Sequence, residues 1–207
     1  MQLDFRHARF LKSANALSDL PADDGREVAF AGRSNAGKSS ALNAISGVGG
    51  LARVSKTPGR TQLINFFTLA GQYRLVDLPG YGYARVPPSI RLHWARLMED
   101  YFTARASLAG LVLVMDMRHP LTDFDRQMLA WVMPLGRPVL ALLTKADKLS
   151  RSARLKSCGD VKTVLAGQVE VLAFSAMSAE GVEAARTLLE HWLTDSGRSP
   201  KEKNPGV

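Results

Sequence analysis

The chain has 207 residues, 46% of them hydrophobic, with ordinary Gly and Pro counts, which predicts one globular domain and excludes collagen-like or long disordered chains. The longest apolar runs are about five residues, too short for a membrane span of roughly 20, and a single cysteine excludes an internal disulfide or a cysteine-rich zinc site. The net charge of +8 indicates either polyanionic partners or a contribution to solubility. With one cysteine and no signal-peptide core in Met1–Asp19, we expect a cytoplasmic protein without a membrane partner.

Short apolar runs alternate with helical patterns along the chain, which is typical of a parallel sheet with crossover helices. Between the second and third runs, Ala70-Gly71 leaves room only for a tight hairpin, so one strand should run antiparallel to the others. The sequence therefore predicts a six-stranded, mostly parallel mixed sheet. The expected strands are Glu27–Ala31, Gln62–Leu69, Gln72–Asp77, Gly110–Asp116, Pro138–Leu143 and Val169–Phe174.

Apolar residues recur at helical spacing in three further segments, and we interpret these stripes as core rather than as ligand sites. The second stripe follows a candidate capping pair, Thr122 and Asp125. Thr194–Val207 is rich in charge, Gly and Pro and is expected to be a frayed tail. The three stripes are Ile90, Trp94, Leu97, Met98, Tyr101 and Phe102; Phe124, Met128, Trp131 and Val132; and Val182, Ala185, Leu188, Leu189 and Trp192.

Gly32–Ser39 fits the phosphate-binding pattern G-x-x-x-x-G-K-[ST] and stands between an expected strand and an expected helix, as that pattern requires. Its glycines let successive backbone N–H groups turn toward phosphate oxygens. Lys38 can reach the β and γ phosphates, and Ser39 can offer its hydroxyl to Mg²⁺. The alternative interpretation is a plain glycine turn ahead of a helix.

Asp77-Leu78-Pro79-Gly80 ends the third expected strand. A carboxylate there can hold the magnesium shell through water, and a glycine N–H can meet the γ phosphate. The pattern D-x-x-G is common in turns, but its distance from Gly32–Ser39 favours a nucleotide site.

Thr144-Lys145-Ala146-Asp147 follows the fifth expected strand. An aspartate at this place can accept the ring N–H and the exocyclic amino protons of guanine, a donor pair that adenine lacks. The methylene stem of Lys145 can cover the base, and the Ser175-Ala176 backbone N–H groups after the sixth strand can meet the guanine oxygen. This set of motifs disfavours one rival, a small-molecule kinase that uses ATP.

With these motifs in order, the chain resembles the translation-factor-related (TrmE-Era-EngA-EngB-Septin-like) P-loop GTPases, and specifically the EngB (YihA/YsxC) family of bacterial ribosome-assembly GTP-binding proteins. The resemblance covers nearly the whole chain, although Thr144 stands where most GTPases have Asn, which removes one amide hydrogen-bonding group. The segments that carry it are Ala8–Ser13, Gly32–Ser40, Pro58–Gln62, Ile64–Phe67, Asp77–Ala84 and Thr144–Asp147.

The resemblance implies GTP or GDP and Mg²⁺ as ligands, and a function in assembly of the large ribosomal subunit, with loss associated with failed division and septation. It implies that Thr61 is the switch threonine, for which the residues alone leave Thr57 as a rival. The implied magnesium set is Ser39, Thr61 and, through water, Asp77. The expected partner is the large subunit or its precursor, and we expect a monomer.

Tyr81 follows Gly80 at the place where Ras-like enzymes have a water-orienting glutamine, so we predict slow intrinsic hydrolysis. Asn35 resembles the asparagine that in related GTPases helps to hold a potassium ion beside the phosphates; the alternative is an ordinary loop asparagine. The expected catalytic residues are Lys38, Thr61, Gly80 and Asn35.

Basic residues concentrate beside the two expected switch loops, which favours an RNA backbone as target, with a solvated face as the alternative. A second function class therefore stays open, a nucleotide-stabilised RNA-binding scaffold with negligible turnover. Val28–Met98 holds nine basic residues against Asp77 as its only acid. Those beside the expected loops are Arg53, Lys56, Arg60, Arg85 and Arg91.

The prediction is thus an α/β P-loop GTPase domain with helices on both faces of the sheet. We expect an N-terminal extension packed on the domain over residues 1–25, the G domain over 26–195 and a flexible tail over 196–207. The residues expected to contact the nucleotide are Gly32, Arg33, Ser34, Asn35, Ala36, Gly37, Lys38, Ser39, Ser40, Gly59, Arg60, Thr61, Gln62, Leu63, Asp77, Leu78, Pro79, Gly80, Thr144, Lys145, Ala146, Asp147, Phe174, Ser175 and Ala176.

Overall fold

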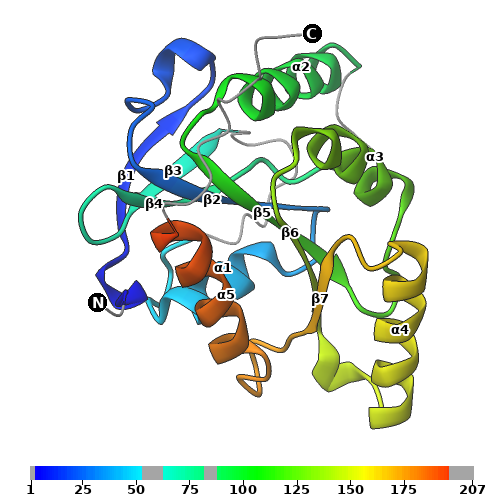
Figure 1. The fold of residues 1–207 in the computed structure, drawn as a ribbon. Coiled ribbons are helices and arrows are strands. Elements are labelled where there is room, and N and C mark those ends of the chain that lie inside the picture. The colour runs from blue at the N-terminus through cyan, green and yellow to red at the C-terminus, as the bar shows by residue number, and fades with distance from the viewer. Residues whose placement is uncertain (1–2, 53–62, 82–87, 196–207) are drawn as a thin grey trace, which may run out of the picture.

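The computed structural model describes residues 3–52, 63–81 and 88–195, and one seven-stranded sheet forms its centre (Figure 1). The strand order is β1-β3-β4-β2-β5-β6-β7. Only β3 runs against the other described strands, because it pairs antiparallel with both β1 and β4 while the remaining pairs are parallel. The strands are β1 (Arg9–Ala14), β2 (Arg26–Gly32), β3 (Ile64–Thr68), β4 (Tyr73–Asp77), β5 (Leu108–Asp116), β6 (Val139–Thr144) and β7 (Glu170–Ala173).

The predicted hairpin is confirmed. β3 and β4 pair from Asn65 opposite Asp77 to Thr68 opposite Arg74, and Gly71 in the connecting turn has a φ of 66°. Glycine adopts such a backbone without steric cost.

The predicted count of six strands is wrong, because residues 9–14, which we expected in the extension, form the edge strand β1. Its first three residues are exposed, and its pairing with β3 shifts register between Phe10 and Lys12. A strand with a register shift and an exposed edge lacks the strict alternation of buried and exposed residues by which strands are predicted.

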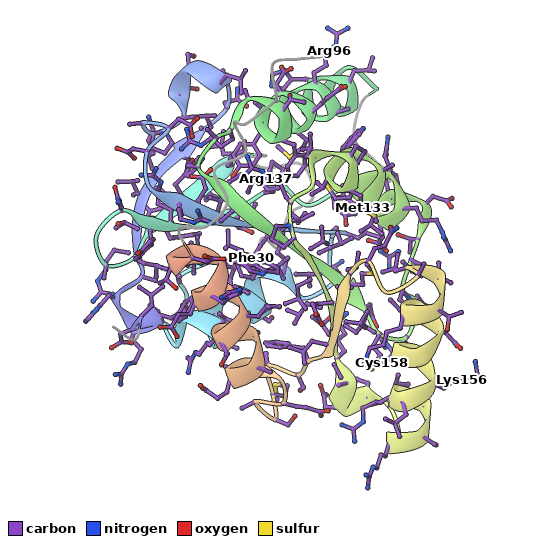
Figure 2. All side chains as sticks on the ribbon, viewed as in Figure 1. Phe30, Arg96, Met133, Arg137, Lys156 and Cys158 are labelled. Atoms are coloured by element: carbon purple, nitrogen blue, oxygen red, sulfur yellow. The ribbon has the colours of Figure 1, made fainter. Side chains whose placement is uncertain are left out.

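Helices cover both faces of the sheet, as predicted (Figure 1). Apolar side chains of α2, α3 and α4 pack against one face, and those of α1 and α5 pack against the other, where Phe30 lies fully buried (Figure 2). The helices are α1 (Lys38–Ser46), α2 (Pro88–Ala104), α3 (Asp123–Val132), α4 (Arg151–Val164) and α5 (Val182–Thr194), with short 3-10 helices η1 (Phe5–His7), η2 (Leu17–Asp19), η3 (Met133–Leu135) and η4 (Ala146–Lys148).

Two helices show what the sequence pattern reports and what it misses. The predicted capping pair of α3 is confirmed, because the Asp125 carboxylate accepts a hydrogen bond from the Thr122 backbone N–H at 2.9 Å. Helix α4 was not predicted. Val161 is its one fully buried residue, so it lacks the apolar stripe of a helix that packs a broad face on the core.

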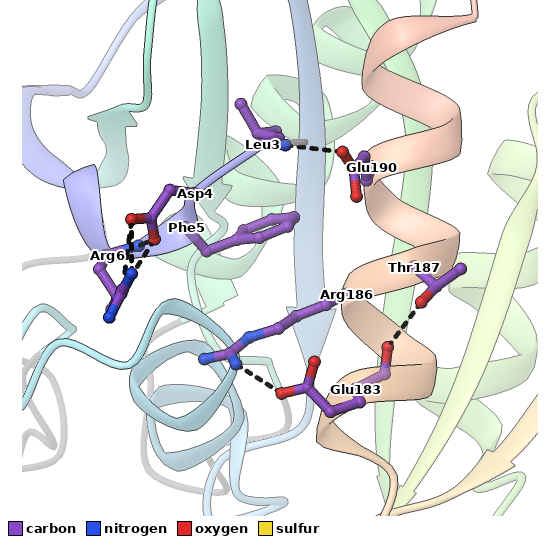
Figure 3. A pocket seen from close by; sticks show the side chains of 8 residues that line it. All are labelled: Leu3, Asp4, Phe5, Arg6, Glu183, Arg186, Thr187 and Glu190. Atoms are coloured by element: carbon purple, nitrogen blue, oxygen red, sulfur yellow. Dashed lines mark hydrogen bonds and ion pairs between the residues drawn. The ribbon is translucent and has the colours of Figure 1, made fainter. Parts of the chain in front are cut away.

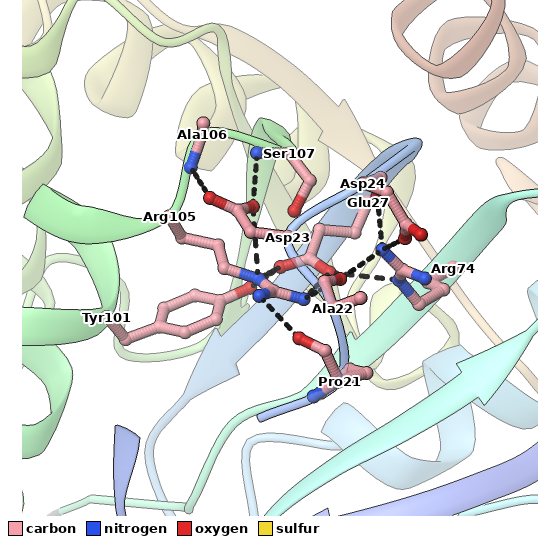
Figure 4. A network of polar contacts seen from close by, with 10 residues as sticks. All are labelled: Pro21, Ala22, Asp23, Asp24, Glu27, Arg74, Tyr101, Arg105, Ala106 and Ser107. Atoms are coloured by element: carbon pink, nitrogen blue, oxygen red, sulfur yellow. Dashed lines mark hydrogen bonds and ion pairs between the residues drawn. The ribbon is translucent and has the colours of Figure 1, made fainter. Parts of the chain in front are cut away.

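A buried polar network joins the amino ends of β2 and β4 to the end of α2 (Figure 4). Glu27 is fully buried, and its carboxylate contacts Arg105 at 2.8 Å and Arg74 at 3.3 Å and accepts the Tyr101 phenol at 2.8 Å. Both arginines also donate to the backbone of residues 21–24. These backbone contacts tie the segment before β2 to the sheet. Glu27 can be buried as a carboxylate because both arginines pair with it.

Candidate functional site

The predicted motifs meet at the carboxyl edge of the parallel strands. The phosphate-binding loop connects β2 to α1, Asp77 ends β4, Thr144 ends β6, and Phe174 follows β7 directly. β2, β5 and β6 are consecutive in the sheet, and the paired residues include Gly32 with Val114 and Asp116 with Thr144. Ligands in open α/β sheets bind at this edge.

The phosphate-binding loop needs its two pattern glycines. Gly37 caps α1 with a φ of 98°, a backbone conformation that other residues rarely adopt. A Cβ at Gly32 would lie 2.7 Å from the carbonyl oxygen of Val114 on β5, which is too close for any side chain. Gly80 lies against the same loop, because a Cβ there would be 3.8 Å from the Ser34 nitrogen.

Lys38 and Asp77 form an ion pair at the start of α1. Both side chains are about nine-tenths buried. The amino end of a helix favours anions, and here it carries an ammonium group and a carboxylate side by side. These groups fit the two charged partners of a magnesium nucleotide, since the ammonium suits phosphate oxygens and the carboxylate suits the shell of a divalent cation.

Thr144 and Lys145 hold the phosphate-binding loop. The buried Thr144 hydroxyl contacts the carbonyl oxygen of Ala36, and also that of Met115 at 2.9 Å. The Lys145 ammonium donates to the carbonyl oxygen of Asn35 at 2.7 Å. The motif expected to recognise the base therefore also fixes the backbone of the phosphate-binding loop.

Asp116 at the end of β5 belongs to this site, although none of the sequence motifs included it. Its carboxylate accepts from Lys145 at 2.9 Å and from Arg118 at 2.7 Å. The hydrogen bond from Arg118, followed by that from Lys145, holds the pKa of Asp116 well below its usual range despite its burial. An aspartate at the end of a buried apolar strand, two residues before an arginine, was the available signal.

Asp147 and Ser175, which we expect to meet the base, lie together. The Ser175 hydroxyl donates to the Asp147 carboxylate at 2.7 Å, and the hydroxyl in turn accepts the N–H groups of Met177 and Ser178 at 3.2 Å. The hydrogen bond from Ser175, followed by that from Lys148, lowers the pKa of Asp147, so it is ionised at neutral pH and has the acceptor oxygens for two hydrogen bonds from guanine.

The structure corrects the role expected of the Ser175 backbone N–H. The Ser175 N–H, which we expected to meet the guanine oxygen, donates to the Glu180 carbonyl at 3.0 Å. The expectation of a contact with that oxygen therefore rests on Ala176.

Several expected residues lie outside the part of the chain that the structure describes. They include Gly59, Arg60, Thr61 and Gln62, the rival Thr57, and the basic residues Arg53, Lys56 and Arg85. Leu63 is described and half-buried just before β3. Arg91 lies in α2, but its side chain is not among those described.

A cavity of about 410 Å³ lies between the N-terminal segment and α5, away from these motifs (Figure 3). None of the predicted site residues lines it. Its arginines are already paired, Arg6 with Asp4 and Arg186 with Glu183, and the Leu3 N–H donates to Glu190. Over residues 3–52, 63–81 and 88–195 there is no group of three or more His, Cys, Asp or Glu suited to a metal ion, and no helix with the length and apolarity of a membrane span.

Comparison with known proteins identifies the family. Residues 27–145 match the family model described as 50S ribosome-binding GTPase. The chain is 56% identical over 192 residues to the probable GTP-binding protein EngB of Methylobacillus flagellatus, covering 91% of this chain and 93% of the relative. It is 52% identical to the protein of the same name from Nitrosomonas europaea over 97% of this chain and 91% of the relative.

Solved structures share the fold at lower identity. A crystal structure of a probable GTP-binding protein EngB superposes with a TM-score of 0.66 at 19% identity, covering 81% of this chain and 98% of that one. Era in complex with MgGDPNP and a fragment of 16S ribosomal RNA superposes with a TM-score of 0.64 at 17% identity, over 84% of this chain and 58% of that one. The P-loop GTPase fold, the assembled motifs and the identity to these relatives show that the chain belongs to the EngB family of GTP-binding proteins.

Proposed function

We propose that this protein is a guanine-nucleotide switch that hydrolyses GTP slowly and acts in assembly of the large ribosomal subunit, with a linked requirement for cell division and septation. The observation that carries the proposal is the position of two polar pairs, Lys38 with Asp77 and Asp147 with Ser175, at one edge of the sheet. They suit the phosphate and base ends of one nucleotide. The proposed location is the cytoplasm, and the proposed form is a monomer.

The proposed ligand set follows from these positions. GTP would lie along Gly32–Ser40, with Lys38 at the β and γ phosphates and the Gly80 N–H at the γ phosphate. Mg²⁺ would be held by Ser39, Thr61 and, through water, Asp77. When bound there, Mg²⁺ supplies positive charge that offsets the charge developing on the phosphates. Release of Thr61 and Gly80 after hydrolysis would change the switch loops and, with them, the basic surface.

The proposed partner is the large ribosomal subunit or its precursor. Two facts support it, the family description as 50S ribosome-binding GTPase and the positive charge of Val28–Met98. The decisive experiment is sedimentation of the purified protein with large-subunit particles in Mg²⁺ with a non-hydrolysable GTP analogue or with GDP. The protein should pellet with the analogue and stay in the supernatant with GDP, and Lys38→Ala should stay in the supernatant with both. Equal pelleting of the wild type with both nucleotides would contradict the switch.

Slow turnover is proposed from Tyr81, and its acceleration by potassium is proposed from Asn35. Tyr81 lacks the paired amide donor and acceptor of a water-orienting glutamine, and its hydroxyl is already bonded to Asp125. Asn35 lies in the phosphate-binding loop with a left-handed backbone, and its side chain is the proposed partial ligand of a potassium ion. Replacing Na⁺ by K⁺ at equal ionic strength should accelerate hydrolysis, and Asn35→Ala should weaken that response more than GDP binding. Equal rates in the two salts would remove the potassium ion from the proposal.

The alternative function is a nucleotide-stabilised RNA-binding scaffold with negligible turnover, and the basic surface alone favours it as much as the switch. Single-turnover hydrolysis separates the two. With purified large-subunit precursors, the switch should hydrolyse bound GTP faster than the isolated protein does, whereas a scaffold should show no acceleration.

A further inference from the structure

Tyr81 ties the phosphate-binding loop to helix α3. Its N–H donates to the Gly32 carbonyl at 3.4 Å and its carbonyl accepts the Ser34 N–H at 2.8 Å, so its backbone pairs in parallel with the start of the loop. Its side chain reaches α3, where the phenol donates to the Asp125 carboxylate at 2.9 Å. The residue that follows Gly80 is therefore held from two sides.

Thr122 holds the Asp125 carboxylate in a fixed orientation for this hydrogen bond. Its second carboxylate oxygen accepts the Thr122 N–H at 2.9 Å and the Thr122 hydroxyl at 2.8 Å, and the residue is 2% exposed. Burial, together with the charge of Asp125, raises the pKa of Tyr81, so the phenol keeps its proton and donates at neutral pH. A hydrogen bond to a buried, charged acceptor whose orientation is fixed is among the stronger ones in proteins.

This contact favours one arrangement of the nucleotide site. With Tyr81 in place, Gly80 lies against Ser34 and the Ser34 N–H is occupied by the Tyr81 carbonyl. In the proposed function only the γ phosphate engages Gly80, and GDP has no γ phosphate. A Cβ on Gly80 would be only 3.8 Å from the Ser34 backbone, so Gly80 must move away from the loop before a γ phosphate can lie between them. A contact that fixes the residue after Gly80 therefore opposes GTP more than it opposes GDP.

We propose that Asp125 is a positioning residue of the switch: through Tyr81 it stabilises the arrangement in which Gly80 rests on the phosphate-binding loop, and it thereby lowers the affinity for Mg²⁺–GTP relative to GDP. The inference rests on the proposed function in one respect, the engagement of the γ phosphate by Gly80. It adds α3 to the elements that respond to the nucleotide state.

Tyr81→Phe is the sharpest test, because it removes the hydroxyl and keeps the ring against Phe124. In Mg²⁺, the dissociation constant of a non-hydrolysable GTP analogue should fall about tenfold, as expected for loss of one hydrogen bond to a charged group, while that of GDP should change less than about twofold. The matched control is Tyr101→Phe, since the buried Tyr101 phenol also donates to a carboxylate, that of Glu27, at 2.8 Å in the network of Figure 4. The control should lower the melting temperature and leave the ratio of the two affinities unchanged.

A double-mutant cycle separates positioning from general loosening. Asp125→Ala also removes the capping contact with Thr122. The double variant loses the same contact, so this loss cancels when the double variant is compared with Asp125→Ala. The Tyr81→Phe/Asp125→Ala protein should have the same affinity ratio as Asp125→Ala alone. An unchanged ratio in Tyr81→Phe, an equal shift for both nucleotides, or additive effects of the two substitutions would each overturn the inference. Failure of the wild type to bind either nucleotide would instead overturn the proposed function.

Discussion

Thr144→Val tests whether the motif expected to recognise the base supports the phosphate-binding loop. Valine keeps the shape of threonine and removes its hydroxyl, which contacts the carbonyl oxygens of Ala36 and Met115 in a position that is 3% exposed. One hydroxyl proton serves one acceptor at a time, so the substitution removes one buried hydrogen bond. Its loss costs about 2 kcal/mol of folding stability if no water molecule replaces the donor. In a protein of this size we expect the melting temperature to fall by about 4 to 8 °C.

The same substitution should weaken nucleotide binding. If about half of the lost energy is needed to order the loop again when GDP binds, its dissociation constant rises about fivefold. The measurements are thermal unfolding by calorimetry and fluorescence titration with a labelled GDP. Thr144→Ser keeps the hydroxyl and should bind GDP like the wild type.

Thr163→Val is the matched control, because the Thr163 hydroxyl bonds only within α4, to the Gly159 carbonyl, and is exposed. It should change stability by less than about 0.5 kcal/mol. A Thr144→Val protein that melts with the wild type and binds GDP with unchanged affinity would refute the supporting role of Thr144.

Three further predictions follow from single contacts. Asp147→Asn replaces an acceptor oxygen by a donor and should move preference from GTP to XTP in competition binding; retained GTP preference would contradict guanine recognition by this residue. Gly110→Ala places a Cβ 2.5 Å from the Trp192 ring and should cost about 1 to 3 kcal/mol by chemical unfolding, whereas Gly159→Ala, with no atom within 4 Å, should be neutral or stabilising. The lowered pKa of Asp116 adds stability above its unfolded pKa of about 4, lost as the pH falls below that value, so Asp116→Asn should show a smaller drop in melting temperature between about pH 5 and pH 3 than the wild type.

The local patterns of the sequence predicted most of the sheet and the places of the four motifs. Glu27–Ala31 became β2 (Arg26–Gly32), and Pro138–Leu143 became β6 (Val139–Thr144), each within one residue at either end. Such runs are buried on both faces, so their apolar character is continuous and does not depend on which neighbour they meet. The hairpin at Gly71 was also predictable, because its turn is determined by adjacent residues.

The tertiary structure decided what depends on partners distant in sequence. Strand β1 exists because an exposed, register-shifted segment meets β3, and α4 folds onto the sheet with little apolar signal of its own. Asp116 and Tyr81 find their partners 29 and 44 residues away, in Lys145 and Asp125. The chemistry of a motif is carried by residue type and spacing, which a sequence displays. The contacts that position the motif depend on how separate elements come together in space, and no local periodicity records that.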